Sequence, residues 1–240
     1  KDKFEKQNFE KLQLNDFDEL EQYILHKIYN INKSVESTLK SYNFHKLYKD
    51  LLNFCTLDLS SFYFDIRKDV LYCDSLNSQK RKNCVVVLNI ILESLLKWFA
   101  PILVFTTDEI YSLINKNEKN IHEHLFVKVP KSWENNKLND KWDELFKIKQ
   151  EANIAIEAKR SSKEIGSSLE AEIKLSVNQN QFELLKNLDL AEYFITSKAE
   201  KILSKNEKMK IVVNKATGNK CQRCWKILEK KCERSECPIN

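Results

Sequence analysis

The chain has 240 residues, of which 42% are hydrophobic and 31% charged, and its formal net charge is +5 at pH 7. This length and apolar content suffice for two domains, or for one domain with appendages. With two glycines and three prolines the chain has little material for tight turns, so we expect a mainly helical fold. Polar residues interrupt the most apolar stretch, 84–105, which excludes a membrane span, and the N-terminus lacks the apolar core of a signal peptide. We therefore predict a cytoplasmic protein that does not contact a membrane.

Apolar residues at three- and four-residue spacing predict an antiparallel helical bundle over residues 1 to about 116. The first helix is expected over residues 17–39. A second apolar stripe runs through residues 47–70 and predicts a long helix that ends near Tyr72.

A third helix should run over residues 79–99, because Pro101 disfavours the helical state of the residue before it. Thr106 and Glu109 then have the spacing of a capping box. They predict a short fourth helix that begins there and ends at Ile114.

Residues 117–217 are predicted to form a linker and a small α+β junction. Helical spacing returns over residues 142–160, whereas residues 172–177, 193–195 and 210–213 have the pattern of strands. The predicted fold class is mainly α: a helical bundle, then the α+β junction, then a small module at residues 218–240.

Four cysteines lie in this last module, spaced C-x2-C-x7-C-x4-C: Cys221, Cys224, Cys232 and Cys237. Two cysteines two residues apart can turn both sulfurs inward from one tight turn, and a second pair completes a tetrahedral thiolate site for structural zinc. The segment has little else to bury, so we predict one Zn²⁺ per chain. Two disulfides or unpaired surface thiols are the alternatives. The remaining cysteines lie in apolar or helical contexts typical of a reduced, intracellular chain: Cys55, Cys73 and Cys84.

The positive charge is concentrated near the C-terminus. Residues 198–234 contain twelve Lys or Arg against four Glu, a net charge of +8, whereas residues 1–197 sum to −2. A compact positive module is typical of a protein that binds a phosphate backbone. The alternative is a Lys-rich solvated surface.

No catalytic motif is visible. With two glycines the chain has neither a G-x-G-x-x-G turn nor a P-loop, and no G-x-S-x-G signature accompanies its four histidines. We predict no catalytic residues in this chain.

Several sequence blocks together resemble the anticodon-binding domain of bacterial-type isoleucyl-tRNA synthetase. The longest is DLSSFYFDIRKD at residues 58–69, with further blocks at 43–46, 53–55, 71–73 and 100–106. EAKR at 157–160 and IGSSLEA at 165–171 resemble that enzyme's C-terminal junction, and CQRCW at 221–225 resembles its zinc module. The blocks occur in the enzyme's order and span nearly the whole chain.

The resemblance implies an RNA-binding region whose partner is isoleucine tRNA, with Arg223 and Trp225 against the anticodon loop. A Trp beside a zinc-binding turn is a good platform for base stacking, although the ring could instead form the small core of the module. The ATP-binding elements of class I synthetases have no counterpart here, so ATP and Mg²⁺ would bind only to a catalytic domain upstream. We expect the chain alone to be inactive and monomeric. The fourth zinc ligand is Cys237 or a residue beyond Asn240.

Two other classes of protein share part of this pattern. A zinc-ribbon nucleic-acid-binding protein would have the basic tail without the bundle, and a structural scaffold would have the bundle without the charge. Valyl-, leucyl- and methionyl-type synthetases share the bundle, but the CxxCW motif argues against them.

Overall fold

The computed structural model describes residues 4–115, 120–204 and 208–234. It divides the chain into two compact units, one made of residues 1–67 and 76–136, the other of residues 68–75 and 137–240. Most of the predicted linker after the bundle and the predicted ligand Cys237 lie outside the described residues. The domain boundaries expected near residues 116 and 217 stay predictions.

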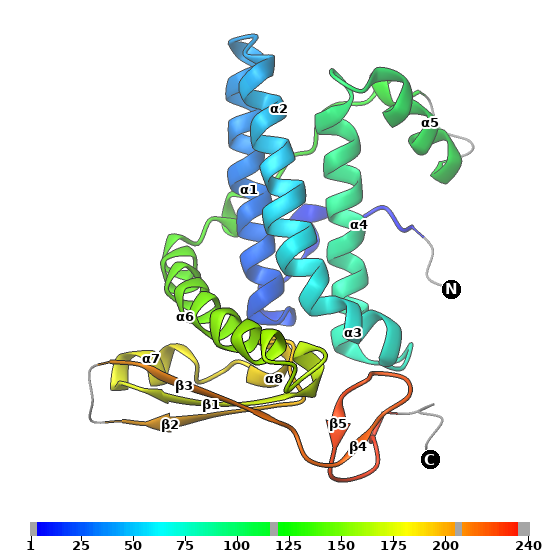
Figure 1. Cartoon of the computed structure of the whole chain (residues 1–240). Coiled ribbons are helices and arrows are strands. Elements are labelled where there is room, and N and C mark those ends of the chain that lie inside the picture. Colours follow the sequence, from blue (N-terminus) through cyan, green and yellow to red (C-terminus); the bar gives the residue numbers. More distant parts are fainter. Residues whose placement is uncertain (1–3, 116–119, 205–207, 235–240) are drawn as a thin grey trace. The chain divides into compact units, whose positions relative to one another are not determined.

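Long helices build the first unit, as the sequence predicts (Figure 1). Their bounds are α1 Glu19–Lys40, α2 Phe44–Asn53, α4 Gln79–Phe99 and α5 Val104–Ile114. A π-helical segment, Phe54–Phe64, continues α2 into α3, Asp65–Cys73. The long helix predicted to end near Tyr72 is thus confirmed, with an unpredicted π-helical centre, and the third predicted helix is confirmed at both ends.

The apolar stripes of these helices are buried. Ile24, Ile28 and Val35 on α1 are at most 1% exposed, as are Leu47 and Leu51 on α2. Burying each such side chain contributes about 1.5–3 kcal/mol. The packing of amphipathic faces, rather than helix propensity alone, therefore holds these helices together.

A buried ion pair connects α1 to the first turn of α3. Glu21 accepts hydrogen bonds from Nε and Nη2 of Arg67, at 2.6 and 2.5 Å, and from the hydroxyl of Tyr63 at 3.2 Å. Burial, followed by the charge of Glu21, raises the pKa of Tyr63 well above its ordinary value, so the phenol stays protonated and donates. Removing Arg67 would leave the buried carboxylate of Glu21 without its ion-pair partner, which makes this contact a strong constraint on how α1 and α3 pack.

The predicted start of the fourth helix is wrong. α5 begins at Val104, and its N-cap is Leu103, whose side chain cannot accept a hydrogen bond. The chain reverses directly after α4, where the backbone N–H groups of Ile102 and Leu103 donate to Phe99 O, so the helix starts before the expected capping box. The predicted end at Ile114 is confirmed.

The second unit combines a helix with a small sheet. α6 spans Asn136–Ser161, longer than the predicted 142–160, and is followed by β1 Ala171–Val177, α7 Gln179–Leu184, α8 Leu190–Tyr193, β2 Lys198–Leu203 and β3 Lys210–Lys215. The sheet has the order β2-β1-β3, with β1 parallel to β2 and antiparallel to β3. Alternate residues of β1 are buried, which is the pattern that predicted this strand.

The strand predicted at residues 193–195 is wrong. Asp189 caps a helical turn there by accepting from the backbone N–H of Glu192 at 3.0 Å, and Ile195 adopts φ +56°. Tyr193 is buried, with its ring 5.7 Å from that of Trp142. The apolar residues 193–195 therefore belong to a helical turn whose apolar side packs into the core. β2 was not predicted, because its exposed, Lys-rich residues carry no apolar alternation.

A two-stranded hairpin, β4 Asn219–Lys220 and β5 Ile227–Leu228, frames the predicted C-terminal module. Gly218, just before it, has φ +126°, and a Cβ there would lie 2.3 Å from Leu228 O. Only glycine fits this position. In the part of the chain that the structure describes, no helix is both long enough and apolar enough to cross a membrane.

Candidate metal centre and nucleic-acid interface

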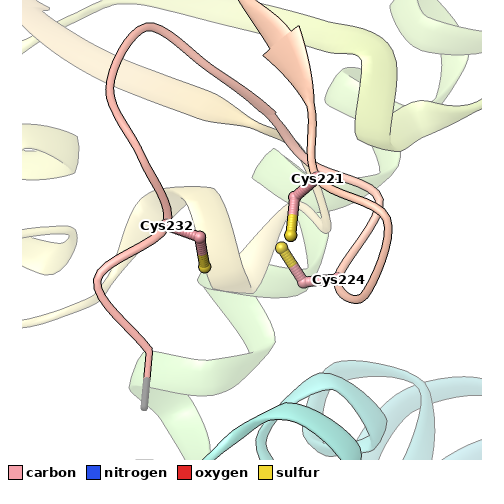
Figure 2. A group of neighbouring side chains, drawn as sticks. All are labelled: Cys221, Cys224 and Cys232. Atoms are coloured by element: carbon pink, nitrogen blue, oxygen red, sulfur yellow. The ribbon is translucent and has the colours of Figure 1, made fainter. Parts of the chain in front are cut away.

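Three of the four C-terminal cysteines form one cluster. The Sγ atoms of Cys221, Cys224 and Cys232 all lie within 4.8 Å of one another. Figure 2 shows Cys221 and Cys224 on the turn between the hairpin strands and Cys232 on the loop that follows, with the three sulfurs facing a common space. The turn is closed by the backbone N–H of Trp225, which donates to Cys221 O at 2.9 Å.

The cluster can hold a metal ion. Tetrahedral zinc binds thiolate sulfur at about 2.3 Å, which places two ligand sulfurs about 3.8 Å apart, so small side-chain movements would bring these three into position. None of the described cysteines forms a disulfide, so no disulfide competes for them in that part of the chain. The disulfide alternative is therefore not seen for Cys221, Cys224 or Cys232.

The thiol of Cys224 is a poor acid without a cation beside it. Burial raises its pKa to about 12; the backbone N–H of Lys226 works against this, and the neighbouring Cys221 thiol adds to it. A bound cation would reverse this balance, because it stabilises several adjacent thiolates at once.

Trp225 is exposed and has an unusual backbone conformation. It leaves 61% of its surface accessible, so the ring is not the core of the module. Its φ is +62°, in the left-handed region that glycine adopts without strain. For a bulky side chain this conformation costs roughly 1–2 kcal/mol. An exposed aromatic kept at a strained position points to a role beyond folding.

The side chain of Arg223 is less exposed than the sequence indicates. It is half-buried, and its Nη2 donates to Tyr72 O at 3.1 Å. Tyr72 lies in residues 68–75, which belong to the same unit as the cysteine cluster. The guanidinium is thus at least partly engaged within the protein.

Part of the positive charge of the tail is neutralised internally. Arg234 forms a two-point ion pair with Asp69, at 2.8 and 2.7 Å, and its Nε lies 3.3 Å from Asp74. Lys226 lies 3.7 Å from Asp69, and Lys220 lies 3.3 Å from Glu170. Burial would raise the pKa of Asp69, but the Arg234 guanidinium outweighs it and holds that pKa below its ordinary value.

Sequence reasoning missed the residues that surround the cluster. Cys73 packs against Cys221 and Cys224, and its thiol donates to Arg223 O at 3.9 Å. On the sheet side, the hydroxyl of Ser197 accepts from the backbone N–H of Ile227 at 2.6 Å. These partners are far apart in sequence, so no spacing pattern could have revealed them.

Comparison with known proteins identifies relatives of this chain. Residues 21–175 match the family described as the anticodon-binding domain of tRNA ligase. The isoleucine–tRNA ligase of Pelagibacter ubique is 57% identical over 233 residues, which cover 97% of this chain and 26% of that protein. The enzymes of the same name from Gluconobacter oxydans and Bartonella quintana are 35% and 36% identical and are covered to 23% each, with 93% and 88% of this chain aligned.

The chain thus spans about a quarter of the length of the curated relatives it matches. The resemblance drawn from the sequence blocks is confirmed. The chain belongs to the family of anticodon-binding domains of tRNA ligases.

Proposed function

We propose that this chain recognises the anticodon stem-loop of isoleucine tRNA for an isoleucine–tRNA ligase whose ATP-dependent chemistry resides in a part of the protein outside this sequence. The observation that carries the proposal is Trp225, an exposed ring in a strained conformation beside a cysteine cluster. The identity of the tRNA rests on the names of the relatives. We expect the protein to act as a monomer in the cytoplasm.

The metal of the cluster is proposed to be Zn²⁺, one per chain, held by Cys221, Cys224 and Cys232 with Cys237 as the fourth ligand. A soft, all-thiolate donor set favours zinc over oxygen-loving cations. The zinc would fix the turn on which Arg223 and Trp225 lie. The chain's own residues then perform recognition: the ring stacks on an unpaired base, and the positive charge of Arg223 attracts a nearby phosphate.

Isoleucine tRNA should bind at least about tenfold more tightly than the same tRNA with its anticodon replaced. Specific recognition reads the edges of unpaired bases, and the hydrogen bonds to one correct base are worth about 1–3 kcal/mol of discrimination. Both affinities are measured at one fixed salt concentration, because phosphate contacts alone bind any RNA. Equal affinities would favour the second candidate, a zinc-ribbon module that binds nucleic acid without reading the anticodon. Tighter binding of valine, leucine or methionine tRNA would instead indicate another class I synthetase.

The chain alone should neither activate isoleucine nor aminoacylate tRNA. Its two glycines provide no loop to cradle ATP phosphates, and in the proposed full-length enzyme ATP and Mg²⁺ would bind to the catalytic domain. Isoleucine-dependent pyrophosphate exchange by the purified chain is expected at background level. Activity that tracks with the purified chain and survives further chromatography would contradict this.

A further inference from the structure

The C-terminal module has few means of holding itself in place. Its two strands have two residues each, and Leu228 is half-buried against the cysteine cluster. Metal binding can fold the turn, but it does not determine the direction in which the turn faces. That direction depends on contacts between the module and the rest of its compact unit.

The strongest of these contacts meet at Asp69. Both carboxylate oxygens accept from Arg234, at 2.8 and 2.7 Å, and Lys226 approaches the same carboxylate to 3.7 Å. The side chains are largely shielded from water, with 20% exposure for Asp69, 26% for Arg234 and 15% for Lys226. A planar, two-point pair of this kind fixes orientation as well as distance.

Trp225 lies between two residues that are anchored to the segment 68–75. Lys226, directly after it, contacts Asp69, and Arg223, two residues before it, donates to Tyr72 O. Ser197 and Glu170 also hold the hairpin, through Ile227 N and Lys220. The backbone around Trp225 is therefore fixed relative to the end of α3 by contacts on both sides.

We propose that Asp69 is a positioning residue for RNA recognition: it orients the C-terminal module, and with it Trp225, without touching the RNA. This inference rests on the proposed function. It also assigns Arg234 and Lys226 to an internal contact, and not to the phosphate-binding surface that the charge of the tail predicted.

The test is to measure the tRNA affinity of Asp69→Asn in the full chain, because the two explanations of the role of Asp69 predict changes in opposite directions. Removing an anion from a surface that binds a polyanion should strengthen tRNA binding if Asp69 acts only through its charge. If Asp69 positions the module, tRNA affinity should fall about tenfold, since the binding-competent orientation is then only fractionally populated. The matched control is Asp140→Asn, an exposed carboxylate on α6 in the same unit, which should leave affinity unchanged or slightly higher.

Two further measurements complete the design. Zinc content of Asp69→Asn should stay at one per chain, while amide hydrogen exchange in residues 219–234 should become faster without RNA present. The double variant Asp69→Asn, Arg234→Gln should lose clearly less tRNA affinity than the sum of the two single losses, because both substitutions remove the Asp69–Arg234 pair. Additive losses would show that Arg234 contacts RNA directly and would overturn the proposal.

Unchanged exchange together with unchanged or tighter tRNA binding in Asp69→Asn would also overturn it, while leaving the proposed function intact if the unmodified chain binds tRNA. An unmodified chain that does not bind tRNA would overturn the proposed function and this role together. Should Asp69→Asn lose zinc, Arg234→Lys decides, since it keeps the cation but cannot form the two-point pair. Weaker tRNA binding with zinc retained then supports the proposal, and unchanged affinity overturns it.

Discussion

Replacing Cys221 and Cys224 together by serine is expected to abolish zinc binding and to unfold the C-terminal module, while the helices of the first unit remain intact. The module buries little apolar surface, so its folding free energy should come mainly from the metal. Structural zinc sites of this kind supply about 10–16 kcal/mol of binding free energy, far more than two short strands can provide. Metal analysis gives the zinc content, and hydrogen exchange in residues 219–234 reports folding of the module.

The chain offers matched controls for this experiment. Cys55→Ser removes a half-buried thiol on the π-helical segment, and Cys73→Ser removes the thiol that packs against the cluster. Both should retain one zinc per chain, whereas Cys237→Ser should lose it. Zinc retained in the Cys221→Ser, Cys224→Ser variant would contradict the site, and loss in Cys73→Ser with retention in Cys237→Ser would make Cys73 the fourth ligand.

Truncating Trp225 to alanine should weaken binding of isoleucine tRNA by about 1–3 kcal/mol, the value of one stacked base, with zinc content unchanged. The ring is exposed, so its removal costs the module little core packing. Affinity and zinc content are measured on the same sample. Full zinc content with unchanged affinity would show that the ring does not touch the RNA.

Two other variants refine this result. Trp225→Gly should also lose the stacking, yet stabilise the turn by about 1 kcal/mol relative to alanine, because glycine adopts φ +62° without strain. Arg223→Ala should weaken tRNA binding and lower the salt dependence by close to one phosphate contact, whereas Trp225→Ala should leave the salt dependence unchanged. A salt dependence that falls equally in both would indicate a general loss of docking.

The helices were predictable where local signals agree with burial. Ser78 accepts from the backbone N–H of Arg81 at the start of α4, and Pro101 follows its end, so both limits of that helix are encoded within a few residues. The start of α5 was not predictable in this way. There the sharp turn after Phe99, and not the capping box at Thr106, determines where the helix begins.

The sheet and the site depend instead on contacts between residues far apart in sequence. Tyr193 and Phe194 are buried, and the Tyr193 ring packs on Trp142, so the apolar residues 193–195 resemble a strand in sequence although they end a helical turn. The cysteine positions could be read from spacing, but the role of Asp69 could not. In the sequence Asp69 is one carboxylate on a helix, and its partner Arg234 lies 165 residues away.

That separation has a consequence for biosynthesis. At roughly 5–20 residues per second, about 8–33 s pass between the synthesis of Asp69 and that of Arg234. During this interval the nascent chain carries Asp69 and Asp74 without the Arg234 that pairs with both in the finished protein, and these anions repel RNA. The same carboxylates that orient the finished module therefore disfavour premature engagement of tRNA by a chain still on the ribosome.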